Sequence, residues 1–206
     1  MRPLSLTVAD LTDRPSDEAP RLNARYGSVA RLFHWGIAVM VLLQIPVGIG
    51  MTSEPLVGVA DPLFILHKGM GSVLLMLVFA RAAWRFSHRP PPLPDYMPPL
   101  EQRIAGYTHI AIYVLLIVMV TSGYVRTVGD GFPIELLDAL GIPPLIPTMP
   151  AVARVMLAVH QFSVVALVGL VAVHVSAVMR HQMIERNPAL SRMWPPLGGR
   201  SGRSDA

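Results

Sequence analysis

The sequence predicts an all-α integral membrane protein built as a bundle of four transmembrane helices, and three observations support this prediction. Of the 206 residues, 52% are hydrophobic and only 15% are charged, a composition that suits a small membrane bundle better than a soluble domain. Four long stretches are nearly free of charge, as membrane spans must be. Basic residues cluster in alternate segments between those stretches, as in membrane proteins with one fixed orientation.

The four expected spans contain almost no acidic or basic side chains and are residues 32–53, 62–80, 104–125 and 155–179. The second is the shortest, and it alone carries a charged residue, Lys68, near its start. Each is long enough to cross the hydrocarbon layer as one helix. We therefore expect a transmembrane domain over residues 31–182, between tails at residues 1–30 and 183–206.

The arginines predict the orientation of the bundle. All but three of the 17 basic residues fall in the two tails and in the loop between the second and third spans. The exceptions are Lys68, Arg126 and Arg154. The positive-inside rule then places both termini in the cytoplasm and the bundle in a bacterial inner membrane. The net charge of +4 follows from this topology and from contact with lipid, and it gives no reason to expect nucleic acid as a partner.

The segments outside the spans differ in composition. Residues 1–30 mix acids, arginines and prolines without the apolar core of a signal peptide, so we expect a cytoplasmic tail. Six prolines within residues 90–99 make the central loop an extended linker. The semi-apolar loop at residues 127–153 indicates a short interfacial helix on the outer surface, followed by a proline-rich stretch.

The chain has no cysteine, which limits its redox chemistry. Iron–sulfur clusters on cysteine ligands, disulfides and the covalent attachment of c-type haem are all excluded. Any haem must therefore be held by axial ligands and packing alone.

Two histidines on the fourth span, His160 and His174, are the strongest functional signal in the sequence. Polar groups inside a membrane are costly and usually face a partner or a cofactor. Fourteen residues fall roughly 40° short of four helical turns, so both imidazoles lie nearly on one face, about 21 Å apart along the axis. This spacing indicates two cofactors, one toward each membrane surface.

The expected topology sorts five histidines into two layers. His67 and His160 lie toward the outer surface, and His34, His109 and His174 lie toward the cytoplasm. Facing imidazoles at matched depth are what a bis-histidine b-type haem needs, because each face of the ring takes one axial nitrogen. A histidine at a helix start can instead be a polar interfacial residue, and a deeper one can hydrogen-bond a neighbouring helix.

Six short stretches have a characteristic order and spacing: RYGSVARLFHW (25–35), LHKGMG (66–71), RAAWR (81–85), GYTHIAIY (106–113), GFPI (131–134) and PPLIP (143–147). Together with the paired histidines of the fourth span, they resemble the bacterial cytochrome b-561 family. The resemblance covers about residues 25–194 and extends to the haem subunits of membrane hydrogenases and formate dehydrogenases.

This resemblance implies a four-helix bundle that holds two non-covalent b-type haems between histidine pairs. One pair is His34 with His174, and the other is His67 with His160. His109 then lies beside the inner haem or at a quinone site, although depth alone leaves it open as a ligand. The resemblance also implies ubiquinone as a substrate.

Five positive side chains lie near the expected haem sites. Arg81 and Arg85 could pair with haem propionates or could simply end the second helix. Lys68 directly follows the expected outer ligand His67 and, with the two arginines on that side, could attract an anionic substrate. The same three cations could equally be ordinary helix-end residues whose charges reach the membrane interface.

An iron whose axial positions are both filled by histidine favours outer-sphere electron transfer over oxygen activation. We therefore expect electron transfer between a periplasmic one-electron donor and membrane quinone. Some family members oxidise superoxide and reduce ubiquinone, so superoxide is the expected donor and the expected activity resembles superoxide:ubiquinone oxidoreductase. One alternative is a haem carrier subunit that serves a partner dehydrogenase or hydrogenase, and another is a haem-free transporter or assembly scaffold.

Overall fold

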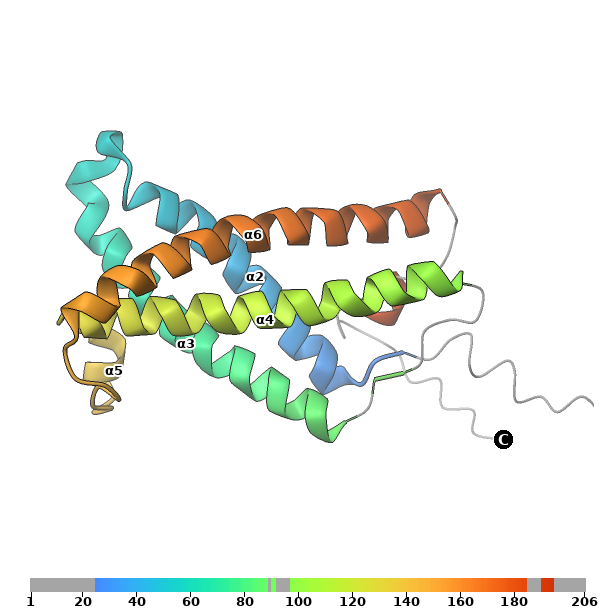
Figure 1. The fold of residues 1–206 in the computed structure, drawn as a ribbon, viewed down its shortest axis with the longest axis horizontal. Coiled ribbons are helices and arrows are strands. Elements are labelled where there is room, and N and C mark those ends of the chain that lie inside the picture. The colour runs from blue at the N-terminus through green and yellow to red at the C-terminus, as the bar shows by residue number, and fades with distance from the viewer. Residues whose placement is uncertain (1–24, 89, 92–96, 185–189, 195–206) are drawn as a thin grey trace, which may run out of the picture.

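The fold consists of four long helices with three short helical segments over the residues that the structure describes. The structure is a computed structural model and describes residues 25–88, 90–91, 97–184 and 190–194. The elements in chain order are α2 (Ser28–Gly50), the 3-10 helix η2 (Glu54–Val59), α3 (Ala60–Ser87), α4 (Pro99–Gly129), α5 (Glu135–Ala139), α6 (Pro150–Met183) and the 3-10 helix η3 (Leu190–Arg192) (Figure 1).

The four long helical segments are apolar and long enough to cross a membrane, which confirms the predicted four-helix membrane bundle. Most of them run past the predicted spans, and α3 continues to Ser87, well beyond residue 80. A run of apolar residues predicts only the part of a helix that lies within the hydrocarbon layer. The helix itself can continue into the headgroup region through polar and basic turns. In contrast, α2 ends at Gly50, where the Thr52 and Ser53 hydroxyls donate to the Ile49 carbonyl of its last turn, and η2 begins at Glu54.

The long helices form a bundle in which α2 packs against α3, α4 packs against α6, and α3 also contacts α4 (Figure 1). Their best-buried large side chains are Leu74 and Val78 of α3 and Leu167 of α6, each only 1% exposed. Leu116 and Val120 of α4 belong to the same apolar cluster. The core is therefore a narrow column of aliphatic side chains along the middle of the bundle.

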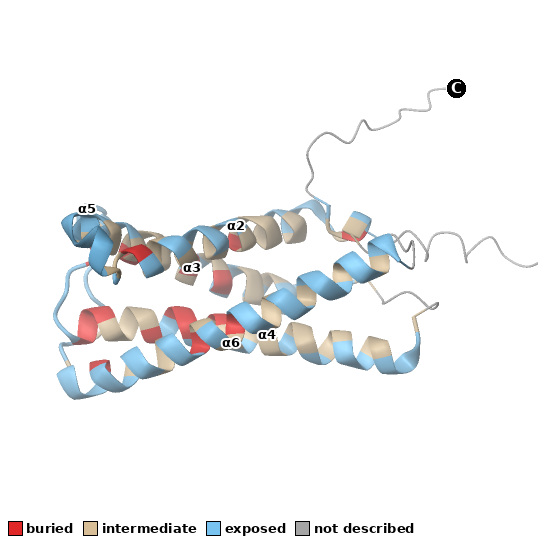
Figure 2. Cartoon of the chain, turned by 90° about the horizontal axis from the view of Figure 1, so that it is seen from above, coloured by how far each residue is buried: buried red, intermediate tan, exposed pale blue. Residues whose placement is uncertain are grey.

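The outward faces of these helices are both apolar and exposed (Figure 2). Leu42 of α2 is 62% exposed, Ile110 of α4 is 61% exposed and Val165 of α6 is 74% exposed. Lipid chains cover such faces without needing hydrogen bonds from them. The distribution of exposed apolar residues thus agrees with a protein surrounded by membrane lipid.

The short helix expected after the third span is α5, and glycines set its position. Gly131 (φ 84°) follows α4 and Gly141 (φ 67°) follows α5 in the left-handed region, which glycine adopts without strain. After α4, the Gly131 N–H donates to the Val128 carbonyl and the Phe132 N–H donates to the Thr127 carbonyl. This is a Schellman motif, which ends the helix and turns the chain sharply.

The loop that contains α5 is shorter than the predicted residues 127–153, because α4 continues to Gly129 and α6 begins at Pro150. The α5 helix packs against α3. Ile134 and Leu137 form a small buried cluster with Val128 of α4. The loop is therefore folded back onto the bundle by its own apolar side chains.

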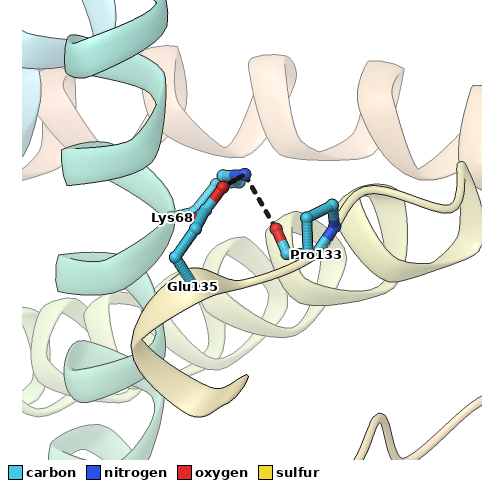
Figure 3. Close-up of polar contacts among 3 residues, drawn as sticks. All are labelled: Lys68, Pro133 and Glu135. Carbon is cyan, nitrogen blue, oxygen red and sulfur yellow. Dashed lines mark hydrogen bonds and ion pairs between the residues drawn. The ribbon is translucent and has the colours of Figure 1, made fainter. Parts of the chain in front are cut away.

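A buried ion pair also ties α5 to α3. The Lys68 ammonium lies 2.8 Å from Oε1 of Glu135 and donates to the Pro133 carbonyl at 2.7 Å (Figure 3). The side chain of Lys68 is 3% exposed and that of Glu135 is 41% exposed. The hydrogen bond from Lys68 holds the pKa of Glu135 below its usual range.

Residues 190–194, part of the expected carboxyl-terminal tail, contact the start of α2. The Tyr26 N–H donates to the Arg192 carbonyl at 3.2 Å, and the Trp35 Nε1 donates to the Met193 carbonyl at 2.6 Å. We call this end of the bundle the η3 end and the opposite one the α5 end (Figure 1). Most of both expected tails (residues 1–24, 185–189 and 195–206) and residues 92–96 of the proline-rich linker lie outside the described residues.

We expect Glu135→Gln to lower the thermal stability of the detergent-solubilised protein. The change removes the carboxylate partner of a buried ammonium, at a cost of about 1–2 kcal/mol once the exposure of Glu135 is discounted. Because the pKa of Glu135 is lowered, its contribution is complete above the ordinary value of 4.5 and is lost as the pH falls through the lowered pKa. Melting curves of variant and wild type should therefore differ at neutral pH and converge in acid.

The control is Asp138→Asn, which removes an exposed carboxylate from the same short helix. This variant should melt at the wild-type temperature. Equal losses in both variants would show that the ion pair contributes no specific stability.

Candidate functional site

Two groups of histidines lie within the bundle, in agreement with the two predicted layers. His67 of α3 and His160 of α6 lie toward the α5 end, with ring centroids 6.3 Å apart and planes at 90°. His109 of α4 and His174 of α6 lie toward the η3 end, with ring centroids 5.4 Å apart and planes at 66°. His34 of α2 joins this second group and is close enough to both of its members for direct charge interaction.

The His160 imidazole is held by the backbone of α4. Its Nδ1 lies 2.8 Å from the Met119 carbonyl oxygen. A carbonyl can only accept, so Nδ1 carries the proton and Nε2 keeps its lone pair. Histidines that bind metals are oriented in this way, through the nitrogen that does not contact the metal.

The His67 imidazole has a different environment. Its Nδ1 is buried and has no hydrogen-bond partner among the described residues. Beside it, Gln44 of α2 donates from Nε2 to the His67 carbonyl at 3.0 Å, whereas its own Oε1 is buried without a partner in the described part of the chain. Buried polar atoms without partners cost about 1–3 kcal/mol each, so a pair of them marks a place where a further group binds.

Glycines make room for both rings of the α5-end pair. A Cβ at Gly123 of α4 would lie 3.0 Å from the His160 ring, and a Cβ at Gly48 of α2 would lie 3.3 Å from Cε1 of His67. Both distances are tighter than nearly all real Cβ contacts, so each ring would have to shift by a few tenths of an ångström. Each imidazole therefore lies against bare backbone from a neighbouring helix.

At the η3 end, Arg81 of α3 lies among the histidines. Its Nε donates to the Tyr113 hydroxyl at 2.8 Å, and its guanidinium lies 5.5 Å from the centroid of the Tyr113 ring. Arg81 is close enough to interact with both His34 and His109, and the exposed Arg85 also interacts with His109. The α3 helix continues well past Arg81 to Ser87, whereas Arg85 lies in its last turn, where a basic side chain also favours a helix end.

The surroundings of Lys68 differ from the exposed position that attraction of an anionic substrate requires. The residue is 7% exposed, and its ammonium is already occupied by Glu135 and Pro133 (Figure 3). It also lies 4.7 Å from the centroid of the Phe64 ring. Lys68, the only lysine of the chain, is thus a buried residue next to His67 that binds α3 to the loop containing α5.

Arg126 of α4 belongs to the same region, although its position in the sequence indicates only a cation near a helix end. Its guanidinium lies 5.8 Å from the centroid of the Phe64 ring and 5.4 Å from that of Phe132. One nitrogen, Nη2, lies 3.7 Å from Asp130, four residues further along the chain. No such spacing links Arg126 to the two rings, because they belong to α3 and to the loop after α4.

The α5-end pair fits the axial ligation of a haem iron. An imidazole nitrogen binds a transition metal at about 2 Å, so two imidazoles on opposite sides of one metal have ring centroids roughly 6 Å apart. The 6.3 Å between His67 and His160 agrees with this distance. The oriented Nδ1 of His160 and the two glycines fit the same use.

Comparison with known proteins agrees with this geometry. Residues 25–196 match the family model described as prokaryotic cytochrome b561. The chain is also 32% identical over 171 residues to Cytochrome b561 homolog 2 of Escherichia coli strain K12, an alignment that covers 82% of this chain and 90% of that relative. The family match includes all four long helices and both histidine groups. This protein therefore belongs to the prokaryotic cytochrome b561 family, as a haem-binding electron-transfer protein of the bacterial membrane.

Proposed function

We propose that the protein carries electrons across the membrane, from a one-electron donor at the α5 end to membrane quinone, with the use of two b-type haems. The observation that carries this proposal is the division of five partly buried histidines into two groups along the bundle. His67 and His160 would hold one haem, and His34 and His174 would hold the other.

The choice of ligands at the η3 end follows the family resemblance, which pairs His34 with His174. The ring of His109 lies 5.4 Å from that of His174, so His109 lies beside this pair. A histidine in that place can donate a hydrogen bond to a quinone carbonyl and transfer a proton, so we assign His109 to the reaction with quinone.

When bound, haem supplies a one-electron iron couple with both axial positions filled, which suits outer-sphere electron transfer. The chain supplies ligands, orientation and charge. The Met119 carbonyl holds His160 in the tautomer that leaves Nε2 free to bind. Arg81, oriented by Tyr113, and Arg85 place positive charge near the η3-end histidines, where it can pair with haem carboxylates.

The donor that we propose is superoxide, and the acceptor is ubiquinone. The distribution of arginines orients the α5 end toward the periplasm. Two superoxide ions would each give up one electron and leave as dioxygen, and one quinone would take up two electrons and two protons. Lys68 would contribute by holding α5 beside His67 through Glu135, and not as a free surface charge.

Purified protein should contain two haems per chain, and each haem should depend on its own histidine pair. His160→Ala should lose only the α5-end haem and His174→Ala only the other, because each change removes one axial ligand. Haem quantification and reduced-minus-oxidised spectra measure both effects. His88→Ala is the control and should keep both haems, since His88 is exposed and stacks on Trp84. One haem per chain in folded wild type would contradict the proposal.

His109→Ala should retain both haems and slow the reaction with quinone. The expected loss is about 100-fold, the lower range for removal of a general acid or base. Stopped-flow oxidation of the reduced protein by a soluble ubiquinone analogue measures this rate. If His109→Ala loses the η3-end haem while His34→Ala keeps it, the two residues exchange their assigned roles.

Superoxide generated outside right-side-out membrane vesicles should reduce quinone, whereas the same treatment of inverted vesicles should not, because the anion must reach the α5 end. The rate should fall with rising salt, since charge attraction is screened beyond about 10 Å at 0.1 M ionic strength. Equal rates in both vesicle types would reject the proposed orientation. If neither vesicle type shows the reaction, the remaining function is that of an electron carrier for a partner dehydrogenase or hydrogenase.

A further inference from the structure

Arg126 lies on the same face of α4 as the glycine that contacts His160. A Cβ at Gly123 would lie 3.0 Å from the His160 ring, and residues three apart in a helix are neighbours on its surface. Arg126 is accordingly close enough to His160 for direct charge interaction. Its guanidinium therefore lies next to the α5-end histidine pair, one helical turn closer to the α5 end than Gly123.

Two of the three nitrogens of the Arg126 guanidinium lack a hydrogen-bond acceptor in the described part of the chain. Its Nε and Nη1 are buried and have no hydrogen-bond partner among the described residues. The remaining nitrogen, Nη2, faces Asp130 at 3.7 Å, longer than a hydrogen bond. Buried guanidinium N–H groups are rarely left without an acceptor, because their loss of water is then uncompensated.

Two aromatic rings hold this guanidinium in place. The Phe64 and Phe132 rings lie 5.8 Å and 5.4 Å from Arg126 and contact each other edge to face. Aromatic contacts orient the planar guanidinium and leave its N–H groups available for a planar acceptor. Phe64 precedes His67 by less than one turn of α3, so the rings form part of the wall beside the histidine pair.

The other cation of this region is already neutralised. Lys68 also contacts Phe64, but Glu135 and the Pro133 carbonyl occupy its ammonium (Figure 3). Glu135 Oε1 is bound to Lys68, Glu135 Oε2 is buried without a partner among the described residues, and Asp130 faces only Nη2 of Arg126. The Nε and Nη1 N–H groups of Arg126 are therefore the cationic donors in this cluster of described residues that lack an acceptor.

We infer that these unpartnered N–H groups of Arg126 bind a carboxylate of the haem held by His67 and His160. The inference rests on the proposed function. A b-type haem carries two propionate carboxylates, and a guanidinium N–H donates a strong, charge-assisted hydrogen bond to a carboxylate oxygen. Arg126 is thus a cofactor-binding residue of the α5-end site, with the role that we propose for Arg81 and Arg85 at the other end.

The test measures haem release from the full-length protein to an excess of a haem-scavenging apoprotein. The slow phase that disappears in His160→Ala identifies the α5-end haem. Arg126→Gln should accelerate this phase about tenfold or more, as expected for loss of a charge-assisted hydrogen-bonded contact. Arg126→Lys keeps the charge and should lie between Arg126→Gln and wild type. The control is Arg154→Gln, which removes an exposed arginine of α6 at the α5 end of the bundle. This variant should release haem at the wild-type rate.

Haem dimethyl ester, whose propionates carry no charge, separates carboxylate binding from an indirect effect. After reconstitution with this ester, wild type and Arg126→Gln should release it at the same rate. If Arg126→Gln accelerates release of haem and ester equally, Arg126 acts on the fold or on His160, and the inference is wrong. The unchanged release phase of the η3-end haem verifies that the variant is folded.

Two further outcomes separate this inference from the proposed function. If wild type holds two haems and Arg126→Gln releases both at wild-type rates, only the inference fails. If wild type holds no haem that depends on His160, the proposed function fails, and the inference falls with it.

Discussion

Lipid offers no hydrogen bonds, so every polar side chain inside a span must find its partner within the protein. Most of the spanning helices satisfy this constraint locally: Ser163 donates to the Val159 carbonyl and Thr127 donates to the Gly123 carbonyl. Unpartnered buried side-chain atoms of the described residues lie mainly at the α5 end, on Gln44, His67, Arg126 and Glu135, and one more lies on Arg31 at the η3 end. The concentration of such atoms at the α5 end supports a site there for a polar cofactor.

The same constraint explains why the histidine pair and the loop that follows α4 belong to one structural unit. The Met119 carbonyl and Gly123 of α4 orient His160, and the same helix then ends in the Schellman motif at Gly131. That turn sends the chain back over α3, where Glu135 meets Lys68 beside His67. The end of α4 therefore positions His160 directly and covers His67 through α5.

The sequence was sufficient to predict the four spans and the two histidine groups, because both follow from hydropathy and from the helical period. It did not predict the partners of Lys68 or the rings around Arg126. Lys68 and Glu135 are 67 residues apart, and their contact depends on the direction in which the chain leaves α4. That direction follows from the positive φ of Gly131, which hydropathy and spacing do not reveal. The contact of residues 190–194 with the start of α2 could not be predicted either. Its acceptors are backbone carbonyls, which every residue type carries.

The two ends of the bundle are built differently, and the difference matches the two reactions that we propose. At the α5 end a fixed pair of imidazoles lies under a short helix that an ion pair holds in place. Oxidation of superoxide moves one electron and needs no proton donor, so fixed ligands and nearby positive charge are sufficient. At the η3 end a third imidazole, His109, lies against His174. Reduction of quinone needs protons as well as electrons, and an imidazole that does not bind iron remains able to supply them. The additional histidine therefore belongs at the end where quinone reacts, and its absence from the α5-end pair agrees with a donor that releases only an electron.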